Sequence, residues 1–185
     1  MPLLLALAAE ASVGTAGWAA VGLPQMGALA AKSVGLDLAC GLWVDEPGRQ
    51  WAQVVATLAE VVPVVLVGQL GPVPGQIARR LAAVLRRSGS VLLAAGSWDG
   101  AEVRMNVVSA AWEGVSEGHG LLRGRRARVA AVGRGTSAVP RYADMWLPGP
   151  DGRGAPLPTG AAVPDGPETV SDVQHGERPA LRVVR

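Results

Sequence analysis

The stretch Val62–Leu70, VPVVLVGQL, constrains the fold of this 185-residue chain more than any other segment. It is a short, almost wholly apolar run, rich in β-branched residues, and it breaks at Gly68. A run of this length is too short for an isolated helix and predicts a strand buried on both faces. Helix-period segments at residues 48–61 and 74–88 flank it. The run therefore lies in the middle of a β-α-β-α series, which predicts a parallel sheet.

The rest of the first hundred residues continues this pattern. Residues 3–11 predict a buried helix with an apolar stripe of Leu3, Leu4, Leu7, Ala8 and Ala11. Further strands are expected at residues 17–21, 41–44 and 90–95. A helix is expected from Pro24 to Gly35, with Met26, Leu29 and Ala30 on one face. In the helix at 48–61, the expected stripe is Trp51, Val54, Val55, Leu58 and Val61.

After Trp98 the pattern changes to long extended segments separated by Gly-rich turns. Residues 103–112, 121–132 and 139–147 read as antiparallel strands added to the parallel core. From residue 149 the chain is rich in Pro, Gly and acids, which predicts a largely disordered tail after a domain of residues 1–148. The tail ends in an apolar segment, residues 180–185, that suits a docking peptide or a late strand.

Composition excludes several classes of protein. A single cysteine, Cys40, excludes an internal disulfide and a Cys-cluster metal site, and it fits a reducing cytoplasm. No apolar run reaches the length of a membrane span, and residues 1–12 lack the basic start of a secretory signal. The net charge of +2 is uneven, because residues 79–141 hold eleven arginines against four acids.

Motifs for catalysis are not found in the sequence. There is no GxxxxGK[ST] phosphate loop and no GxSxG elbow. His119 and His175 are far apart, and a histidine-based triad or metal site needs more partners than these two. We therefore expect no enzymatic activity, no cofactor and no metal.

Two groups of arginines could contact phosphates. Arg79, Arg80, Arg86 and Arg87 are better explained as the solvated face of one helix. The denser group on the second extended segment is Arg123, Arg125, Arg126 and Arg128. This group suits nucleic-acid phosphates and a solvated sheet face about equally.

The order of elements from residue 3 to residue 147 resembles the RecA core just after its phosphate loop. The helix at 24–35 ends in KSVGLD, residues 32–37, where RecA-type cores carry a similar K-L-G-V-D step. The segment WLPGPDG, residues 146–152, resembles actinobacterial ImuA-type proteins, the RecA-related partners of ImuB in damage-induced mutagenesis. The resemblance implies a RecA-like three-layer α/β core with a mostly parallel sheet that lacks the phosphate-loop strand.

The sequence departs from the RecA pattern at the positions that carry out catalysis and bind DNA in RecA. The catalytic Glu of RecA falls near Leu23 or Pro24, and the metal-binding Asp falls on Gly68. The two DNA-binding loops are reduced to residues 71–74 and 96–101. Phosphate donors, water-activating base and metal ligand are all lost, so neither ATP hydrolysis nor RecA-type filament formation is expected.

The resemblance then implies a partner surface. We expect a non-catalytic, cytoplasmic and nucleoid-associated adaptor of the SOS response that binds ImuB and, through it, an error-prone replicative-type polymerase. The partner-binding residues would be Leu42, Trp43, Val44, Trp51 and Val55, on the expected edge strand and the helix after it. Plain core packing is the alternative for Trp51, and Trp43 stays open. The alternative functions are a DNA-binding module that uses Arg123–Arg128 and an inhibitor that caps RecA filaments.

The missing strand leaves a gap beside residues 90–95. Either the segment 103–112 closes against these residues, or the tail segment 181–184 inserts. Closure is the favoured expectation, because Pro- and Gly-rich tails seldom order fully. It predicts that deleting residues 153–185 leaves the melting temperature of the core almost unchanged.

Overall fold

The apolar run forms β3 (Val64–Val67), which is buried along its whole length. It lies between two parallel neighbours, β1 (Trp18–Val21) and β4 (Val91–Ala94), and β2 (Gly41–Val44) pairs in parallel with the far side of β1. The computed structural model describes residues 1–15, 17–116, 119–134, 139–158, 161, 163 and 181–184. These residues confirm a parallel series of strands at the expected positions.

The extended segments after residue 100 form the antiparallel part of the sheet. Two long strands, β5 (Val103–Ser116) and β6 (His119–Gly133), pair with each other, and β7 (Arg141–Trp146) and β8 (Ala155–Pro156) follow. The described residues thus make one nine-stranded sheet in the order β2-β1-β3-β4-β9-β5-β6-β7-β8. Only three of its eight strand pairings are parallel, so the expectation of a mostly parallel sheet is wrong and the sheet is mixed.

The largest correction concerns β9 (Leu181–Val184). This strand inserts between β4 and β5, antiparallel to both, and Glu102 N donates to Val183 O at 2.9 Å. The favoured closure of residues 103–112 against residues 90–95 is therefore wrong. The apolar residues of 181–184 explain the insertion, because Leu181 and Val184 are buried and backbone groups of β4 and β5 gain partners. The tail residues 164–180, expected to be disordered, lie outside the described residues.

Helices cover both faces of the parallel strands. α1 (Pro2–Ala11) and α2 (Ala28–Val34) lie on one face, and α3 (Trp51–Ala59) and α4 (Gly75–Ser88) on the other. Side chains of β3 alternate between these layers, with Val64 and Leu66 in the α1 core and Val65 and Val67 in the α3–α4 core. This alternation follows from the period of two along a strand.

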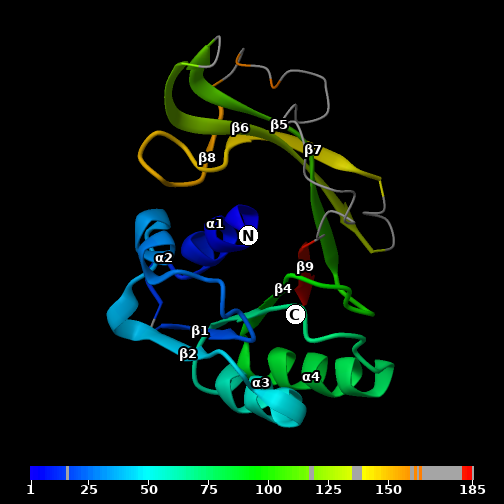
Figure 1. Ribbon diagram of the computed structural model, residues 1–185. Coiled ribbons are helices and arrows are strands. Elements are labelled where there is room, and N and C mark those ends of the chain that lie inside the picture. Colours follow the sequence, from blue (N-terminus) through cyan, green and yellow to red (C-terminus); the bar gives the residue numbers. More distant parts are fainter. Residues whose placement is uncertain are drawn as a thin grey trace.

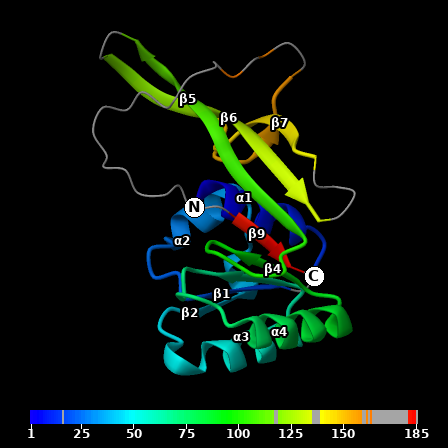
Figure 2. The ribbon, with the colours of Figure 1, turned by 90° about the vertical axis from the view of Figure 1, so that its right-hand side faces the viewer.

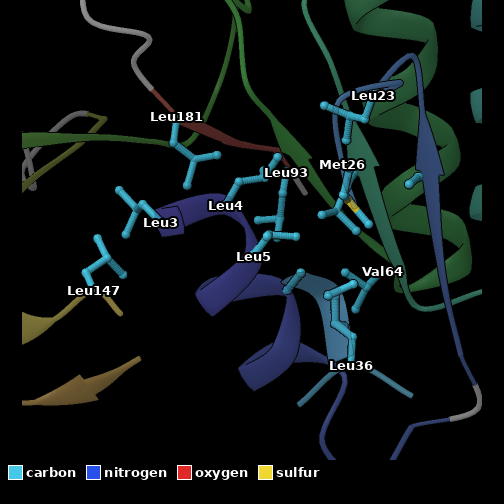
Figure 3. Close-up of a cluster of buried hydrophobic side chains, with 14 of the residues drawn as sticks. Leu3, Leu4, Leu5, Leu23, Met26, Leu36, Val64, Leu93, Leu147 and Leu181 are labelled. Carbon is cyan, nitrogen blue, oxygen red and sulfur yellow. The ribbon is translucent and has the colours of Figure 1, made fainter. Parts of the chain in front are cut away.

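The sheet wraps around α1. Strands β1, β3 and β4 pass on one side of this helix, and β5, β6 and β7 pass on the other (Figures 1 and 2). One cluster of buried side chains accordingly contains leucines of α1, Leu93 of β4, Ala127 of β6 and Leu181 of β9. Figure 3 shows Leu3 turned towards Leu147 and Leu4 close to Leu181. Helix α1 is therefore the centre of the main core.

Some helix positions differ from the expected stripes. Leu5 is buried on α1 while Leu7 is only half-buried. α2 begins at Ala28, four residues after Pro24, so that Ala31 is buried and Leu29 is 82% exposed. α3 is preceded by the 3-10 turn Gly48–Gln50 and ends at Ala59, which leaves Val61 69% exposed. These differences concern where the helices begin and end, not whether they form. The ends of α2 and α4 were predicted correctly, since Gly35 and Gly89 end them in left-handed conformations.

Candidate functional site

β2 is the open edge of the sheet. It pairs with β1 on one side, and no described strand pairs with its other side (Figure 1). Gly22 N donates to Val44 O at 2.8 Å, so the backbone groups of Val44 face β1. Backbone groups alternate in direction along a strand, so those of Leu42 also face β1 and those of Trp43 face outward. Trp43 therefore offers the donor and acceptor that an added strand would meet.

The side chains on this edge divide between packing and exposure. The Trp43 ring stands edge-on to Trp18, with ring centroids 5.1 Å apart and an interplanar angle of 74°. Trp18 is buried, and its Nε1 donates to Asp37 O at 2.8 Å. Leu42 is 44% exposed. On this edge, the Trp43 ring is therefore held against Trp18, and the Leu42 side chain is exposed.

The helix beside the edge contributes less than expected. Trp51 is half-buried and stands edge-on to Trp98, with ring centroids 6.2 Å apart. Val55 is fully buried among the residues of β1, β3, α3 and α4, so its assignment as a partner-binding residue is wrong. In the sequence, Val55 lies in the apolar stripe of its helix, and a residue in such a stripe can face either the core or a partner. The sites that remain accessible are Leu42, Trp43 and Val44, with Trp51 beside them.

The opposite end of the sheet is protected. β8 is only two residues long and contains Pro156, which has no backbone N–H. Short edge strands and proline are common devices against unwanted strand pairing. Of the two outermost strands of the described sheet, β2 is the one that lacks these devices.

A cavity of about 670 Å³ opens where β1, β3 and β4 end. Gly22–Gln25 after β1, Gln69 after β3, Ala95 after β4, the start of α1 and Arg125 contribute to its wall. Ligands of α/β sheets usually bind at such strand ends. Burial, and next the charge of Arg125, lower the pKa of the Met1 amino group here. Among the described residues, the lining contains amides and a guanidinium and no carboxylate.

Gly68 has a steric reason to be glycine. A Cβ at this position would overlap the carbonyl oxygen of Gly22 and lie 3.1 Å from Leu23 Cδ2. The loops after β1 and β3 therefore touch at Gly68, the position that the RecA resemblance assigned to a metal-binding Asp. No side chain larger than hydrogen fits there without a shift of the backbone.

The four arginines of β6 do not form one cationic face. Arg126 and Arg128 bind acids of the neighbouring strands: Arg126 Nε lies 2.7 Å from Glu113 Oε1, and Arg128 makes two bonds of 2.8 and 2.9 Å to Asp144. The Arg128 bond is the main reason that the pKa of Asp144 is lowered. Arg125 lies on the opposite face and lines the cavity, and Arg123 is exposed. Two of the four expected phosphate contacts are thus already neutralised.

Sequence reasoning missed a second cationic pair. Arg104 of β5 and Arg182 of β9 lie directly opposite each other. They are far apart in the sequence, and only the insertion of β9 brings them together. No local signal could have found this pair.

Two observations concern the described residues as a whole. No helix in the described part of the chain is both long and apolar enough to cross a membrane. Nor do three or more His, Cys, Asp or Glu side chains gather as metal ligands anywhere among the described residues.

The fold places the chain among α/β proteins built on one mixed sheet with helices on both faces. It belongs to the family described as the MT3502 N-terminal domain, whose model matches residues 1–100. It is also 31% identical over 141 residues to the uncharacterized protein Rv3395c of Mycobacterium tuberculosis (strain ATCC 25618 / H37Rv), an alignment that covers 71% of this chain and 69% of that protein. The family match contains every parallel strand, and so includes the open edge.

Proposed function

We propose that this protein is a non-catalytic adaptor that receives an extended segment of a partner protein along β2. The observation that carries the proposal is the asymmetry of the two sheet edges. β2 presents outward backbone groups at Trp43 and an exposed Leu42, whereas β8 ends the sheet with Pro156. Strand addition takes affinity from backbone hydrogen bonds and specificity from neighbouring side chains.

The resemblance to ImuA-type proteins supplies the partner. We propose an ImuB-type protein as the source of the incoming segment, and an error-prone polymerase as the enzyme recruited through it. The function is then assembly of a translesion-synthesis complex in the cytoplasm, at the nucleoid, after DNA damage. The match to a mycobacterial protein is consistent with the actinobacterial character of this resemblance.

The strand order supports a RecA-related core. In the RecA sheet the phosphate-loop strand lies next to the strand that corresponds to β4. Here β9 occupies that place, and it runs antiparallel to β4. A RecA-type frame whose nucleotide-binding strand has been replaced by a strand from the far end of the chain would account for this order.

The chemistry of the strand ends supports a non-catalytic role. Leu23 and Pro24 occupy the expected place of the catalytic Glu, and Gly68 occupies that of the metal-binding Asp. The contact between position 68 and Gly22 O leaves no room for a carboxylate. We therefore propose that the protein does not hydrolyse ATP.

A pair of variants at Trp43 tests strand addition. Trp43→Ala and Trp43→Pro both lose the ring that packs on Trp18, but only the proline also loses the outward N–H. Binding to an immobilised ImuB-type protein should be much weaker for the proline variant than for the alanine variant. Circular dichroism of both variants controls for folding. Equal binding by two folded variants would contradict docking along β2.

The RecA-capping alternative is tested in the same assay. RecA replaces the ImuB-type protein on the surface, and the wild-type chain is injected over both. Capture by RecA alone would contradict the proposed partner. Capture by the ImuB-type protein with the expected Trp43 pattern would support it.

A further inference from the structure

A pair of like charges joins β5 to β9 in the described sheet. Arg104 and Arg182 are direct antiparallel partners, so their side chains project from the same face. Cβ atoms of such partners lie about 5 Å apart, and like charges at this separation destabilise the pair of strands. A folded sheet that keeps two arginines there retains an electrostatic cost that a neutral residue would remove.

No acid in the described part of the chain offsets this cost. The ion pairs of the neighbouring strands join Arg126 to Glu113 and Arg128 to Asp144. Arg182 Nη1 donates to Leu181 O at 3.3 Å, and neither Arg104 nor Arg182 forms an ion pair with a described carboxylate, Glu102 included. Burial, and next the charge of Arg104, lower the pKa of Arg182. Among the described residues, the two guanidinium groups therefore lack a counter-charge.

The same face continues into a polar and aromatic row. Asn106 of β5 pairs with Ala130 of β6, which pairs with Tyr142 of β7. Asn106 is exposed, Tyr142 is 63% exposed, and the alanine between them is small. The tyrosine ring is therefore accessible on the face that carries the arginines.

We propose that Arg104, Arg182 and Tyr142 form a binding site for single-stranded nucleic acid. The two guanidinium groups hold a backbone phosphate between them, and an unpaired base stacks on the tyrosine ring. Strands lie about 4.8 Å apart and alternate residues about 7 Å apart, so Arg104 and Tyr142 are separated by about 12 Å. This distance lets successive nucleotides of one strand reach both groups.

The aromatic ring favours a nucleic acid over an acidic protein segment. Both ligands carry anions that suit the arginine pair. Only the nucleic acid also carries flat rings, and stacking of bases on exposed aromatic side chains is the general mode of single-strand binding. The arrangement of charge and ring on one face therefore matches a single strand.

This site is separate from the docking edge. β2 is the first strand of the sheet, whereas β9, β5, β6 and β7 lie on the far side of β4. It also differs from the expected phosphate contacts on β6, where Arg126 and Arg128 are bound to acids. The inference therefore stands or falls independently of the proposed partner.

Fluorescence anisotropy with a fluorescein-labelled 20-nucleotide oligo(dT) tests the site on the full chain. The double variant Arg104→Gln/Arg182→Gln should bind more weakly by on the order of tenfold for each arginine. The slope of log affinity against log salt should become shallower by about 0.7, because the one phosphate contact that the two arginines share is lost. The matched control, Arg79→Gln/Arg80→Gln, removes the same charge from the exposed face of α4 and should change neither quantity appreciably.

Two further variants isolate the base contact. Tyr142→Ala should weaken binding by between about 5-fold and 100-fold, because it removes the stacking ring. Tyr142→Phe keeps the ring and should bind like the wild type. Equal losses in the two variants would contradict stacking and overturn the assignment of Tyr142.

Thermal melting and competition complete the test. Without nucleic acid, Arg182→Gln should melt at or above the wild-type temperature, because the like-charge pair is removed. Polyglutamate should compete far less well than unlabelled oligo(dT). Equal competition by polyglutamate, equal loss of affinity in the α4 control, or no detectable binding of oligo(dT) by the wild type would each overturn the proposal.

Discussion

Leu93 of β4 lies directly opposite Val183 of β9, and this pairing joins the parallel strands to the last described strand of the chain. On its other side Val183 lies opposite Val103 of β5. Leu181 of the same strand is buried in the core around α1, and Val184 is buried in the core beneath α4. β9 therefore connects the parallel and the antiparallel halves of the sheet and contributes to both cores.

Removing residues 181–185 should destabilise the protein strongly. Burial of one leucine and one valine is worth about 3–6 kcal/mol together, and the backbone groups of β4 and β5 lose their partners as well. For a chain of this size we expect a fall in Tm of roughly 10 °C or more, measured by differential scanning calorimetry. This expectation reverses the sequence-based prediction for deletion of the tail. A change in Tm of less than about 2 °C would show that β9 does not hold the sheet together.

A single substitution separates core packing from loss of the strand. Leu181 is 4% exposed, so Leu181→Ala should lower the free energy of unfolding by about 2–5 kcal/mol. Leu29→Ala removes the same atoms from a side chain that is 82% exposed and should stay within about 0.5 kcal/mol of the wild type. Urea unfolding curves measure both values. Similar values for the two variants would place Leu181 outside the core.

Gly68 should resist substitution for a steric reason. Gly68→Ala places a Cβ against Gly22 O and should cost about 1–3 kcal/mol in the free energy of unfolding. Gly75→Ala is the matched control, because it lies in the first turn of α4 with no heavy atom within 4 Å of the added Cβ. This control should be neutral or stabilising by about 0.4–1 kcal/mol. Thermal melting of the two variants measures the difference. Equal melting temperatures for Gly68→Ala and Gly75→Ala would contradict a steric requirement for glycine at position 68.

The Arg128–Asp144 ion pair should make the stability of the folded protein depend on pH in the acidic range. Bonding to Arg128 lowers the pKa of Asp144 in the folded state below its unfolded value. The pair therefore contributes stability above the unfolded pKa, and this contribution is lost as pH falls through the folded pKa. Asp144→Asn should be less stable than the wild type near neutral pH, and the difference should vanish in strong acid.

Because both side chains are partly exposed, the coupling measured in a double-mutant cycle with Arg128→Ala should be on the order of 0.5 kcal/mol. The cycle is measured by urea unfolding at neutral pH and again in acid. A difference between the Asp144→Asn variant and the wild type that does not change with pH would contradict a role for the ion pair.

The local parts of the fold could be predicted from the sequence. Runs such as residues 62–70 and 90–95 specify buried strands because few other structures bury so many apolar residues in so short a length. Gly35 and Gly89 end their helices as expected because each position needs a left-handed backbone. The start of α2 was misplaced because residues 22–27 bury Leu23 and Met26 from a turn, which gives a helix-like spacing without a helix.

The long-range parts could not be predicted. Insertion of residues 181–184 beside β4 was one of two alternatives that the sequence allowed, and nothing in these four residues decided between them. The Arg104–Arg182 pair depends on that insertion, and the burial of Val55 depends on how α3 and α4 pack together. The acid partners of Arg126 and Arg128 lie on β5 and β7, and only the register of the strands reveals them.

The position of β9 also has a consequence for synthesis on the ribosome. β4 emerges roughly 90 residues before the strand that completes its edge, an interval of about 5–20 s at usual elongation rates. During that interval β4 and β5 each present unpaired backbone groups and apolar side chains to other nascent chains. A factor that shields exposed strand edges should therefore associate with this protein while it is being made and leave once Leu181–Val184 has docked.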